Sequence, residues 1–279
     1  MRFANLGGRM VIVVDGGAID VATASGGRFG PDPAACYESW AEFVAWAAGA
    51  TGTVTPYDPA LLGAPSPAPR QSYGIGLNYS AHAAEANAPH PEFPPTFTKF
   101  PTCITGPYAD VELPTEFVDH EIELVVVIGT YAYRVSRQDA WSHVAGLTVG
   151  QDITERVVQK RPPAPQFCLG KSFPGFGPTG PVLVTPDEFA NPDDLALSCS
   201  VNGVTMQSSR TGDLIFSVPQ LIEMLSDITP MLPGDVIFTG TPSGVGSLAK
   251  PPRFLKAGDQ LVSTIEGIGS MTTTFVARR

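Results

Sequence analysis

The chain has 279 residues and a formal net charge of −10 at pH 7. This acidity argues against a nucleic-acid-binding protein, because neutralising phosphates requires clustered Lys and Arg side chains. Hydrophobic residues make up 43% of the chain, and Gly and Pro together about a fifth. The composition therefore predicts a globular protein with a sizeable core and excludes low-complexity disorder.

The apolar runs of the sequence are too short to cross a membrane. The longest, at residues 10–14 and 124–129, fall far below the roughly 20 residues that a spanning helix needs. The N-terminal residues lack the features of a secretory signal peptide. The four cysteines form no Cys-x-x-Cys pair, which favours reduced thiols over disulfides or a zinc site. We therefore expect a cytoplasmic protein without nucleic-acid or membrane partners.

The N-terminal segment predicts a small β-rich module. Residues 9–14 and 18–21 are apolar runs on either side of an Asp-Gly-Gly sequence, which is the pattern of a β-hairpin. Residues 37–48 carry apolar side chains at helical spacing and predict a helix. The Pro-rich residues 63–71 that follow are typical of an extended linker.

After this segment, short apolar runs alternate with Gly and Pro clusters. We expect helices at residues 136–147 and 218–226, the second with a proline in its first turn. The sequence therefore predicts an α+β fold in which a small N-terminal β-rich domain, residues 1–66, precedes a larger β-rich domain, residues 72–279. The strands expected in the larger domain are residues 75–77, 121–128, 180–184, 195–201, 236–238, 260–265 and 271–276.

Two glutamates stand at the entrance of the strand expected at residues 121–128. Glu121 and Glu123 are two positions apart, so their side chains point to one face, about 6.6 Å apart along the strand. The rest of the strand is apolar on both faces, which predicts burial, and buried carboxylates are costly unless a cation compensates them. This spacing suits a hard dication such as Mg²⁺ or Mn²⁺. Alternatively, the strand begins at Leu124 and both glutamates lie in solvent.

A third acid, Asp152, follows another apolar run and strengthens the metal hypothesis. Three carboxylates leave about three positions of an octahedral ion open for water and substrate. Arg156 and Gln159 are four and seven residues after Asp152, so on a helix they would share its face. An arginine there can bind a carboxylate through two hydrogen bonds.

Lys171 lies in a Gly-Lys-Ser sequence that has the appearance of a phosphate-binding loop. That motif requires a glycine six residues before the lysine, and this chain has Pro165 there, so we reject a nucleotide site. A surface lysine is the plain alternative for Lys171 itself.

His82 and Glu85 are three residues apart and become neighbours if Asn78 or Ser80 caps a helix. A carboxylate that orients a histidine ring raises its basicity, as a general base requires, although an exposed ion pair is the alternative. Thr241 belongs to a Gly-rich turn after a predicted strand, where backbone amides and hydroxyls can contact a carboxylate. The turn lacks the Gly-x-Ser-x-Gly pattern of serine hydrolases.

Together these segments resemble the fumarylacetoacetate hydrolase family. The matching stretches occur in the family's order and spacing and cover nearly all of residues 72–279. They are GLNYSAHAAE (76–85), VDHEIELVVVIG (118–129), GQDITERVVQ (150–159), LGKSF (169–173), DLIFSVPQLI (213–222), PGDVIFTGTPSGVG (233–246) and FLKAGDQL…IEGIG (254–269).

The resemblance implies a bent mixed β-roll for the catalytic domain, a small domain before it, and a homodimer. It also implies a role for each candidate residue. Glu121, Glu123 and Asp152 would bind Mg²⁺ or Mn²⁺, His82 and Glu85 would form a general-base dyad on a mobile lid, Lys171 would contact the oxo or enolate oxygen of the substrate, and further substrate contacts would come from Arg156, Gln159 and Thr241.

The family acts on 2-oxo or 2-hydroxy acids through an enolate. The resemblance implies a metal-dependent enzyme of this kind, most closely a 2-hydroxyhepta-2,4-diene-1,7-dioate isomerase of aromatic catabolism, because the two-part chain is similar to those members. Acylpyruvate hydrolysis and oxaloacetate decarboxylation are alternatives, and an oxo-acid-binding protein without turnover is another. Three positions depart from the family pattern and bear on the shape of the pocket: Gln151, Val157 and Pro174.

Overall fold

The computed structural model describes residues 1–278 and contains mixed β-sheets with few helices, which confirms the predicted α+β fold. The largest sheet has the order β3-β2-β1-β13-β11-β10-β16-β5-β6, with β4 added beside β1 and β7 beside β13. Its strands are β1 (Arg2–Leu6), β2 (Arg9–Val14), β3 (Gly17–Asp20), β4 (Leu62–Gly63), β5 (Ser72–Ile75), β6 (Thr96–Thr98), β7 (Ile104–Thr105), β10 (Ile122–Ile128), β11 (Val144–Gln151), β13 (Gly177–Val184) and β16 (Val236–Phe238).

A second sheet of five strands packs beside the first, and a separate two-stranded ribbon is formed by the chain just before β10 and just after β11. The second sheet has the order β15-β14-β17-β18-β8, and the ribbon pairs β12 with β9. These strands are β8 (Asp110–Leu113), β9 (Val118–Asp119), β12 (Thr154–Glu155), β14 (Ala196–Val201), β15 (Val204–Arg210), β17 (Gln260–Ile265) and β18 (Gly269–Ala277).

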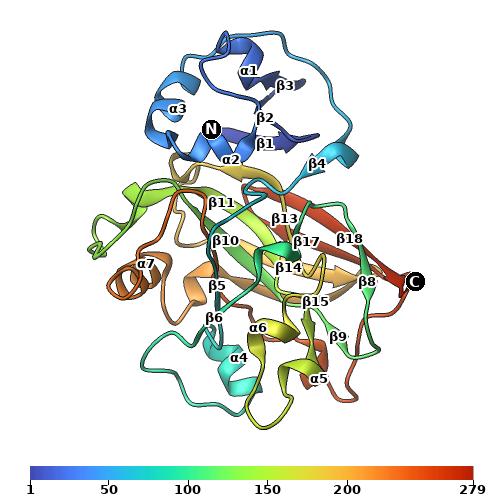
Figure 1. The fold of residues 1–279 in the computed structure, drawn as a ribbon. Coiled ribbons are helices and arrows are strands. Elements are labelled where there is room, and N and C mark those ends of the chain that lie inside the picture. The colour runs from blue at the N-terminus through green and yellow to red at the C-terminus, as the bar shows by residue number, and fades with distance from the viewer. Residues whose placement is uncertain (279) are drawn as a thin grey trace.

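The helices are short and lie around the sheets. In Figure 1 the N-terminal segment lies at the top of the molecule, and α4, α5 and α6 lie together at the opposite end. The α-helices are α1 (Val21–Ala24), α2 (Pro33–Tyr37), α3 (Trp40–Ala47), α4 (Ser80–Glu85), α5 (Arg156–Gln159), α6 (Phe167–Gly170) and α7 (Val218–Ser226). The 3₁₀ helices are η1 (Pro59–Leu61), η2 (Pro101–Cys103), η3 (Ala140–His143), η4 (Pro186–Glu188), η5 (Thr211–Asp213) and η6 (Gly246–Leu248). Within residues 1–278, no helix is long and apolar enough to cross a bilayer.

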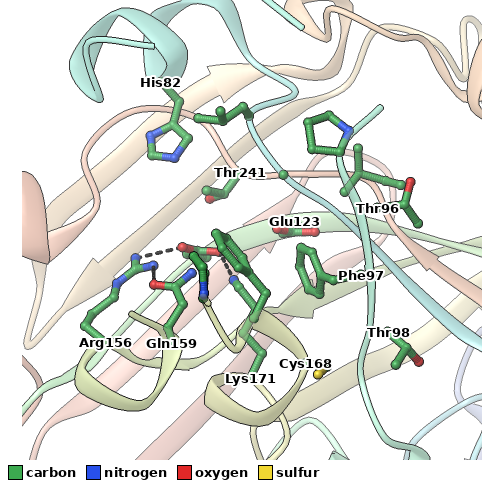
Figure 2. Close-up of a pocket in the computed structure, with 17 residues that line it drawn as sticks. His82, Thr96, Phe97, Thr98, Glu123, Arg156, Gln159, Cys168, Lys171 and Thr241 are labelled. Carbon is green, nitrogen blue, oxygen red and sulfur yellow. Dashed lines mark hydrogen bonds and ion pairs between the residues drawn. The ribbon is translucent and has the colours of Figure 1, made fainter. Parts of the chain in front are cut away.

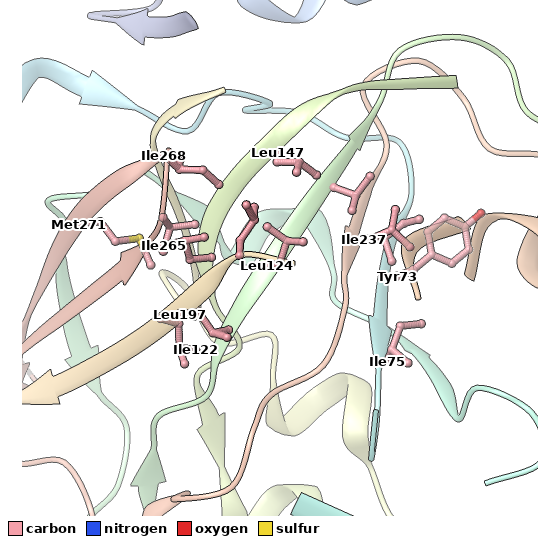
Figure 3. Close-up of a cluster of buried hydrophobic side chains, with 14 of the residues drawn as sticks. Tyr73, Ile75, Ile122, Leu124, Leu147, Leu197, Ile237, Ile265, Ile268 and Met271 are labelled. Atoms are coloured by element: carbon pink, nitrogen blue, oxygen red, sulfur yellow. The ribbon is translucent and has the colours of Figure 1, made fainter. Parts of the chain in front are cut away.

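Strand β10 lies at the centre of the core and is buried along its whole length. Because side chains alternate along a strand, Val125 and Val127 face the N-terminal segment, whereas the other apolar residues of β10 face the five-stranded sheet. Figure 3 shows the cluster formed by these other residues, with Ile122 and Leu124 near side chains of the five-stranded sheet and with Tyr73, Ile75 and Ile237 farther along the large sheet. Its labelled members are Tyr73, Ile75, Ile122, Leu124, Leu147, Leu197, Ile237, Ile265, Ile268 and Met271. A strand held on both faces is a rigid support for the residues at its ends.

The N-terminal segment continues the large sheet. The predicted hairpin is present, since β2 pairs with β3 across a two-residue turn, although its second strand stops at Asp20 and Val21 begins α1. Strand β1 pairs with β2 on one side and with β13 on the other, so this segment shares its hydrogen-bonded sheet with the rest of the chain. A separate domain at residues 1–66 therefore remains a prediction.

The Pro-rich residues 63–71 pack against the body of the protein. Ala64 and Ser66 are buried, and the Ser66 hydroxyl donates a hydrogen bond of 2.6 Å to the Gly234 carbonyl. After β4, this segment has the extended character expected from its prolines, but its contacts tie it to the loop before β16.

The helix predicted at residues 136–147 is wrong. Only η3 is helical there, and β11 begins at Val144. Val144, Leu147 and Val149 are all buried, because β11 lies between β10 and β13. Apolar spacing alone does not distinguish a helix from a strand that is buried on both faces.

Two other predicted boundaries change. The helix expected at residues 37–48 is divided into α2 and α3, since Ser39 leaves the helical conformation with φ −129° and ψ 39°. The strand expected at residues 75–77 ends at Ile75, because Leu77 adopts a positive φ of 51°. The helix α7 begins as predicted, with Pro219 in its first turn and a Ser217–Gln220 capping box.

Candidate metal centre and active site

Three carboxylates meet where β10 and β11 lie side by side. Glu121 directly precedes β10, Glu123 is its second residue, and Asp152 directly follows β11. The pairing of Ile122 with Gln151 brings these strand ends together, and the Asp152 amide donates to the Glu121 carbonyl at 2.9 Å. One carboxylate oxygen from each acid lies within 4.8 Å of the others. All three side chains are buried, so the solvent-exposed alternative for the glutamates is wrong.

Lys171 contacts two of these acids. Its ammonium nitrogen lies 2.6 Å from Glu121 Oε2 and 2.5 Å from Asp152 Oδ2, and it donates to the Thr154 hydroxyl at 2.9 Å. The side chain is only 2% exposed, so the surface-lysine alternative is wrong. Its position directly after α6 directs the ammonium group back toward the acids.

Arg156 reaches the same cluster from α5. Its guanidinium lies 2.7 Å from Glu121 Oε1, donates twice to Asp119 Oδ2, and donates to Gln159 Oε1 at 3.2 Å. The predicted helical face shared with Asp152 is wrong, because the ribbon strand β12 separates Asp152 from α5, which begins at Arg156. Arg156 and Gln159 do lie together, one turn apart on α5 (Figure 2).

His82 enters the site from α4, on the side opposite α5 (Figure 2). Its Nδ1 lies 3.0 Å from Glu85 Oε2, so the two side chains pair across one helical turn. The other carboxylate oxygen, Glu85 Oε1, accepts a hydrogen bond of 3.0 Å from the Gly244 amide. The predicted helix cap at Asn78 or Ser80 is wrong, because the residue before α4 is Tyr79. The Asn78 side-chain amide instead donates to the Phe216 and Thr239 carbonyls.

The Gly-rich turn after β16 borders the acids. The Thr241 hydroxyl donates to the Ile122 carbonyl at 2.8 Å and accepts from Gln207 Nε2 at 2.8 Å. The Gly240 amide donates to Glu123 Oε2 at 2.9 Å. This turn therefore fixes one metal-candidate carboxylate and presents Thr241 at the edge of the site.

A cavity of about 590 Å³ opens over these residues. Its lining includes the polar residues Glu121, Glu123, Arg156 and Lys171. It also includes an apolar wall with Phe97 and Phe167, whose ring centroids lie 5.8 Å apart. Figure 2 shows that His82, Arg156 and Lys171 border one space. The lining residues are Ile75, Gly76, Leu77, His82, Pro95, Thr96, Phe97, Thr98, Glu121, Glu123, Arg156, Gln159, Pro165, Phe167, Cys168, Lys171 and Thr241.

The three acids differ in their charge environment. Burial disfavours the charged form of Glu121, but Lys171 and Arg156 outweigh it and lower the pKa of this carboxyl to about 2. For Glu123, burial and then the charges of Asp152 and Glu121 raise the pKa well above its usual value. Burial opposes the charge of Lys171, yet Asp152 and Glu121 raise its pKa.

A dication fits this donor set. Three buried carboxylates within reach of one point are the oxygen ligands that Mg²⁺ and Mn²⁺ prefer. The raised pKa of Glu123 shows that its negative charge is poorly compensated by the protein itself. A dication bound between the acids would supply that compensation.

Sequence reasoning missed three buried residues that support the site. Lys99 lies 2.6 Å from Asp152 Oδ1, Asp119 holds Arg156, and Gln207 Oε1 accepts from the Ile122 amide at 2.9 Å. Asp119 could have been identified from the sequence, because it lies two residues before Glu121 and so continues the alternation of Glu121 and Glu123. We find no comparable local signal for Lys99 or Gln207.

The three departures from the family pattern differ in how they relate to the acids. Gln151 is buried, accepts from the Glu121 amide at 2.8 Å and donates to Ser263 at 2.9 Å, so it positions the chain at the first acid. Val157 is 51% exposed on α5, and Pro174 lies in the loop after α6, so neither is needed to form the acid cluster.

Known proteins resemble this chain along most of its length. The family model described as fumarylacetoacetate (FAA) hydrolase C-terminal matches residues 71–276. The chain is 45% identical over 208 residues to oxaloacetate tautomerase FAHD2A, mitochondrial, of Bos taurus, a match that covers 74% of this chain and 66% of that protein. The match thus spans slightly less than two thirds of that relative's length.

Solved structures share the whole fold. A putative HpcE protein from Mycobacterium smegmatis is 49% identical with a TM-score of 0.96, and each chain is covered completely. A probable 2-hydroxyhepta-2,4-diene-1,7-dioate isomerase from Mycobacterium abscessus is 30% identical with a TM-score of 0.83, covering 100% of this chain and 98% of the other. Maleylpyruvate hydrolase from Sphingobium sp. SYK-6, solved with manganese and pyruvate, is 27% identical with a TM-score of 0.79 over both complete chains.

Proposed function

Because the chain belongs to the fumarylacetoacetate hydrolase family, we propose that it is a Mg²⁺- or Mn²⁺-dependent enzyme that interconverts the keto and enol forms of a 2-oxo diacid of the oxaloacetate type. The curated relative that is 45% identical carries the name oxaloacetate tautomerase, which favours this substrate. The isomerase expected from the sequence becomes the second candidate.

One observation carries the proposal. His82, which pairs with Glu85, lines the same cavity as Glu121, Glu123, Lys171 and Arg156, and it does so from the side opposite the two cationic residues. A 2-oxo acid held by its carboxylate and oxo groups on the polar wall would place its C3 carbon toward His82. A base on one side and positive charge on the other are what enolate formation requires.

Glu121, Glu123 and Asp152 would hold the dication, which would supply electrophilic stabilisation of the enolate charge. Arg156 would bind the substrate carboxylate, and Asp119 keeps its guanidinium in place through two hydrogen bonds.

Proton transfer falls to His82. With Nδ1 paired to Glu85, the ring presents Nε2 as the base. Nε2 would take a proton from C3, the C–H electrons would form the C2–C3 double bond, and the C2=O π electrons would move onto the oxygen. That oxygen would take a proton from water to give the enol, and His82 would release its proton to water. The reverse sequence returns the keto form. Lys171 provides positive charge beside the C2 oxygen.

The size and apolar wall of the cavity favour the second candidate, a 2-hydroxyhepta-2,4-diene-1,7-dioate isomerase. A cavity of about 590 Å³ exceeds what a four-carbon diacid fills, and Phe97 and Phe167 could pack a longer carbon chain. The similar structure from Mycobacterium abscessus is named as a probable isomerase of this kind. Both reactions relocate a proton through an enolate, so the same dyad serves either.

The test measures the rate at which the ultraviolet absorbance of enol-oxaloacetate decays, with Mg²⁺ or Mn²⁺ and with chelator. The protein should accelerate the decay above the rate with free metal, and chelation should remove the acceleration. Parallel assays with hydroxydienoates and acylpyruvates identify isomerisation or hydrolysis, and pyruvate release identifies decarboxylation. Metal-dependent binding of oxaloacetate without any acceleration would contradict the proposal and favour an oxo-acid-binding protein.

A further inference from the structure

A buried lysine stands behind the acid cluster, outside the residues that line the cavity. Lys99 directly follows β6 and is 0% exposed. Its ammonium nitrogen donates to Asp152 Oδ1 at 2.6 Å, to the Lys171 carbonyl at 2.5 Å and to the Phe176 carbonyl at 3.1 Å. An ammonium group has three N–H donors, so these partners use them all and fix the group in place.

The two oxygens of Asp152 are thereby divided between two lysines. Oδ1 accepts from Lys99, whereas Oδ2 accepts from Lys171. We infer that Lys99 is a positioning residue that reserves Asp152 Oδ1, so that Asp152 offers a single oxygen to the dication. This inference rests on the proposed function, because it assigns Asp152 to a metal that binds a 2-oxo acid.

The number of oxygens matters because Mg²⁺ and Mn²⁺ in such sites prefer six ligands. Three carboxylates with one oxygen each leave about three positions, enough for a 2-oxo acid that binds through two oxygens. If Asp152 supplied both oxygens, the substrate would compete with it for a position. Lys99 would therefore affect substrate binding more than metal binding.

Lys99 also holds the turn that carries Lys171. The same ammonium group binds the backbone carbonyl of Lys171, whose side chain contacts Glu121 and Asp152. Phe238 from β16 covers it, with the ammonium nitrogen 5.4 Å from the ring centroid. The Lys99 side chain therefore holds Asp152, a proposed metal ligand, and Lys171, a proposed substrate contact, in fixed positions relative to each other.

The experiment compares Lys99→Met with wild type, using calorimetric titration of Mn²⁺ and then of oxalate, which mimics a planar enolate. We expect the variant to bind Mn²⁺ at least as tightly as wild type, because an opposing charge is gone, and to bind oxalate to the Mn²⁺-loaded protein at least ~10-fold more weakly. The exposed Lys250→Met serves as the matched control and should change neither constant. A parallel loss of both affinities, or unchanged oxalate affinity, would overturn the inference.

Wild-type protein provides a second measurement if Lys99→Met does not fold. The relaxation rate of water protons counts the waters on bound Mn²⁺, and a single oxygen from Asp152 predicts about three. Two or fewer waters would contradict the inference. If wild type binds no Mn²⁺, the proposed function itself fails, which separates the two outcomes.

Discussion

Glu123 is the acid for which a bound cation matters most. Lys171 and Arg156 compensate Glu121, whereas Glu123 accepts a hydrogen bond from the Gly240 amide and has a raised pKa caused by burial and by its acidic neighbours. A buried carboxylate of this kind persists where function requires it.

Replacing Glu123 with alanine should therefore abolish metal-stimulated turnover. The change removes one of three oxygen ligands while leaving β10 apolar and buried. Activity is measured against Mn²⁺ concentration, with Glu223→Ala as control, because Glu223 on α7 forms an exposed ion pair with Arg137. Metal-stimulated activity that survives in the Glu123 variant would show that the site is misplaced.

The dyad gives a prediction about rate rather than binding. In Glu85→Gln the side chain can still accept from the Gly244 amide, but a neutral amide replaces the carboxylate that pairs with His82 Nδ1. We expect kcat for oxaloacetate to fall by at least ~100-fold, as for loss of general-base help, with unchanged Mn²⁺ affinity. Calorimetry and the enol assay measure both, and a rate near that of wild type would remove Glu85 from the mechanism.

Local sequence patterns predicted the three acids but not the buried residues that hold them in place. Glu121 and Glu123 follow from the alternation of one strand, and the structure places them together. Lys99 binds Asp152 and Lys171, which are 53 and 72 residues away, so no window along the chain reveals the contact. Gln207 likewise reaches the Ile122 amide from 85 residues away.

At the scale of elements, the loop before η6 connects α4 to the acid-bearing strand. The Gly244 amide binds Glu85, and the Gly244 carbonyl accepts from His120, which lies one residue before Glu121. Asp119 accepts from the amide of Gly246, the first residue of η6. The position of the dyad over the site therefore depends on this loop, in addition to α4 itself.

Gly244→Ala tests that dependence. Gly244 has φ +102°, and an added Cβ would come within 2.2 Å of the Met206 carbonyl oxygen, so the backbone must shift at the residue whose amide binds Glu85. We expect kcat to fall by at least ~10-fold. Gly203→Ala is the matched control, since Gly203 also has a positive φ but open space around it. Equal effects of the two changes on kcat would contradict the role assigned to the loop.

Elements buried on both faces were the hardest to predict. Residues 136–147 have helical spacing, yet most of the apolar residues in this stretch belong to β11, which is covered on either side by β10 and β13. Tertiary pairing overrode local preference there. Helix α7 was predictable because its capping box and proline are local signals.

The whole molecule is held together by a sheet that runs through both parts of the chain. Strand β1 pairs with β13, and Phe3, Phe43 and Val125 share one buried cluster. The sequence suggested a division at residues 1–66 from a change in composition, which carries no information on whether the sheet continues.

Removing residues 1–66 should therefore destabilise the remainder. The deletion would leave β13 with an unpaired edge and expose Val127 and Leu183 to solvent. We expect the product to lose cooperative thermal unfolding or to aggregate, as judged by circular dichroism and light scattering. A soluble fragment that unfolds cooperatively near the temperature of the full chain would instead establish residues 1–66 as a separate domain.

Anomalous diffraction from a crystal soaked in Mn²⁺ and oxalate tests the central claim most directly. We predict one strong manganese peak bounded by carboxylate oxygens of Glu121, Glu123 and Asp152, with oxalate bound to the ion on the side that faces His82. A manganese peak elsewhere, or a site where these three carboxylates turn away from one another with no ion between them, would contradict the account.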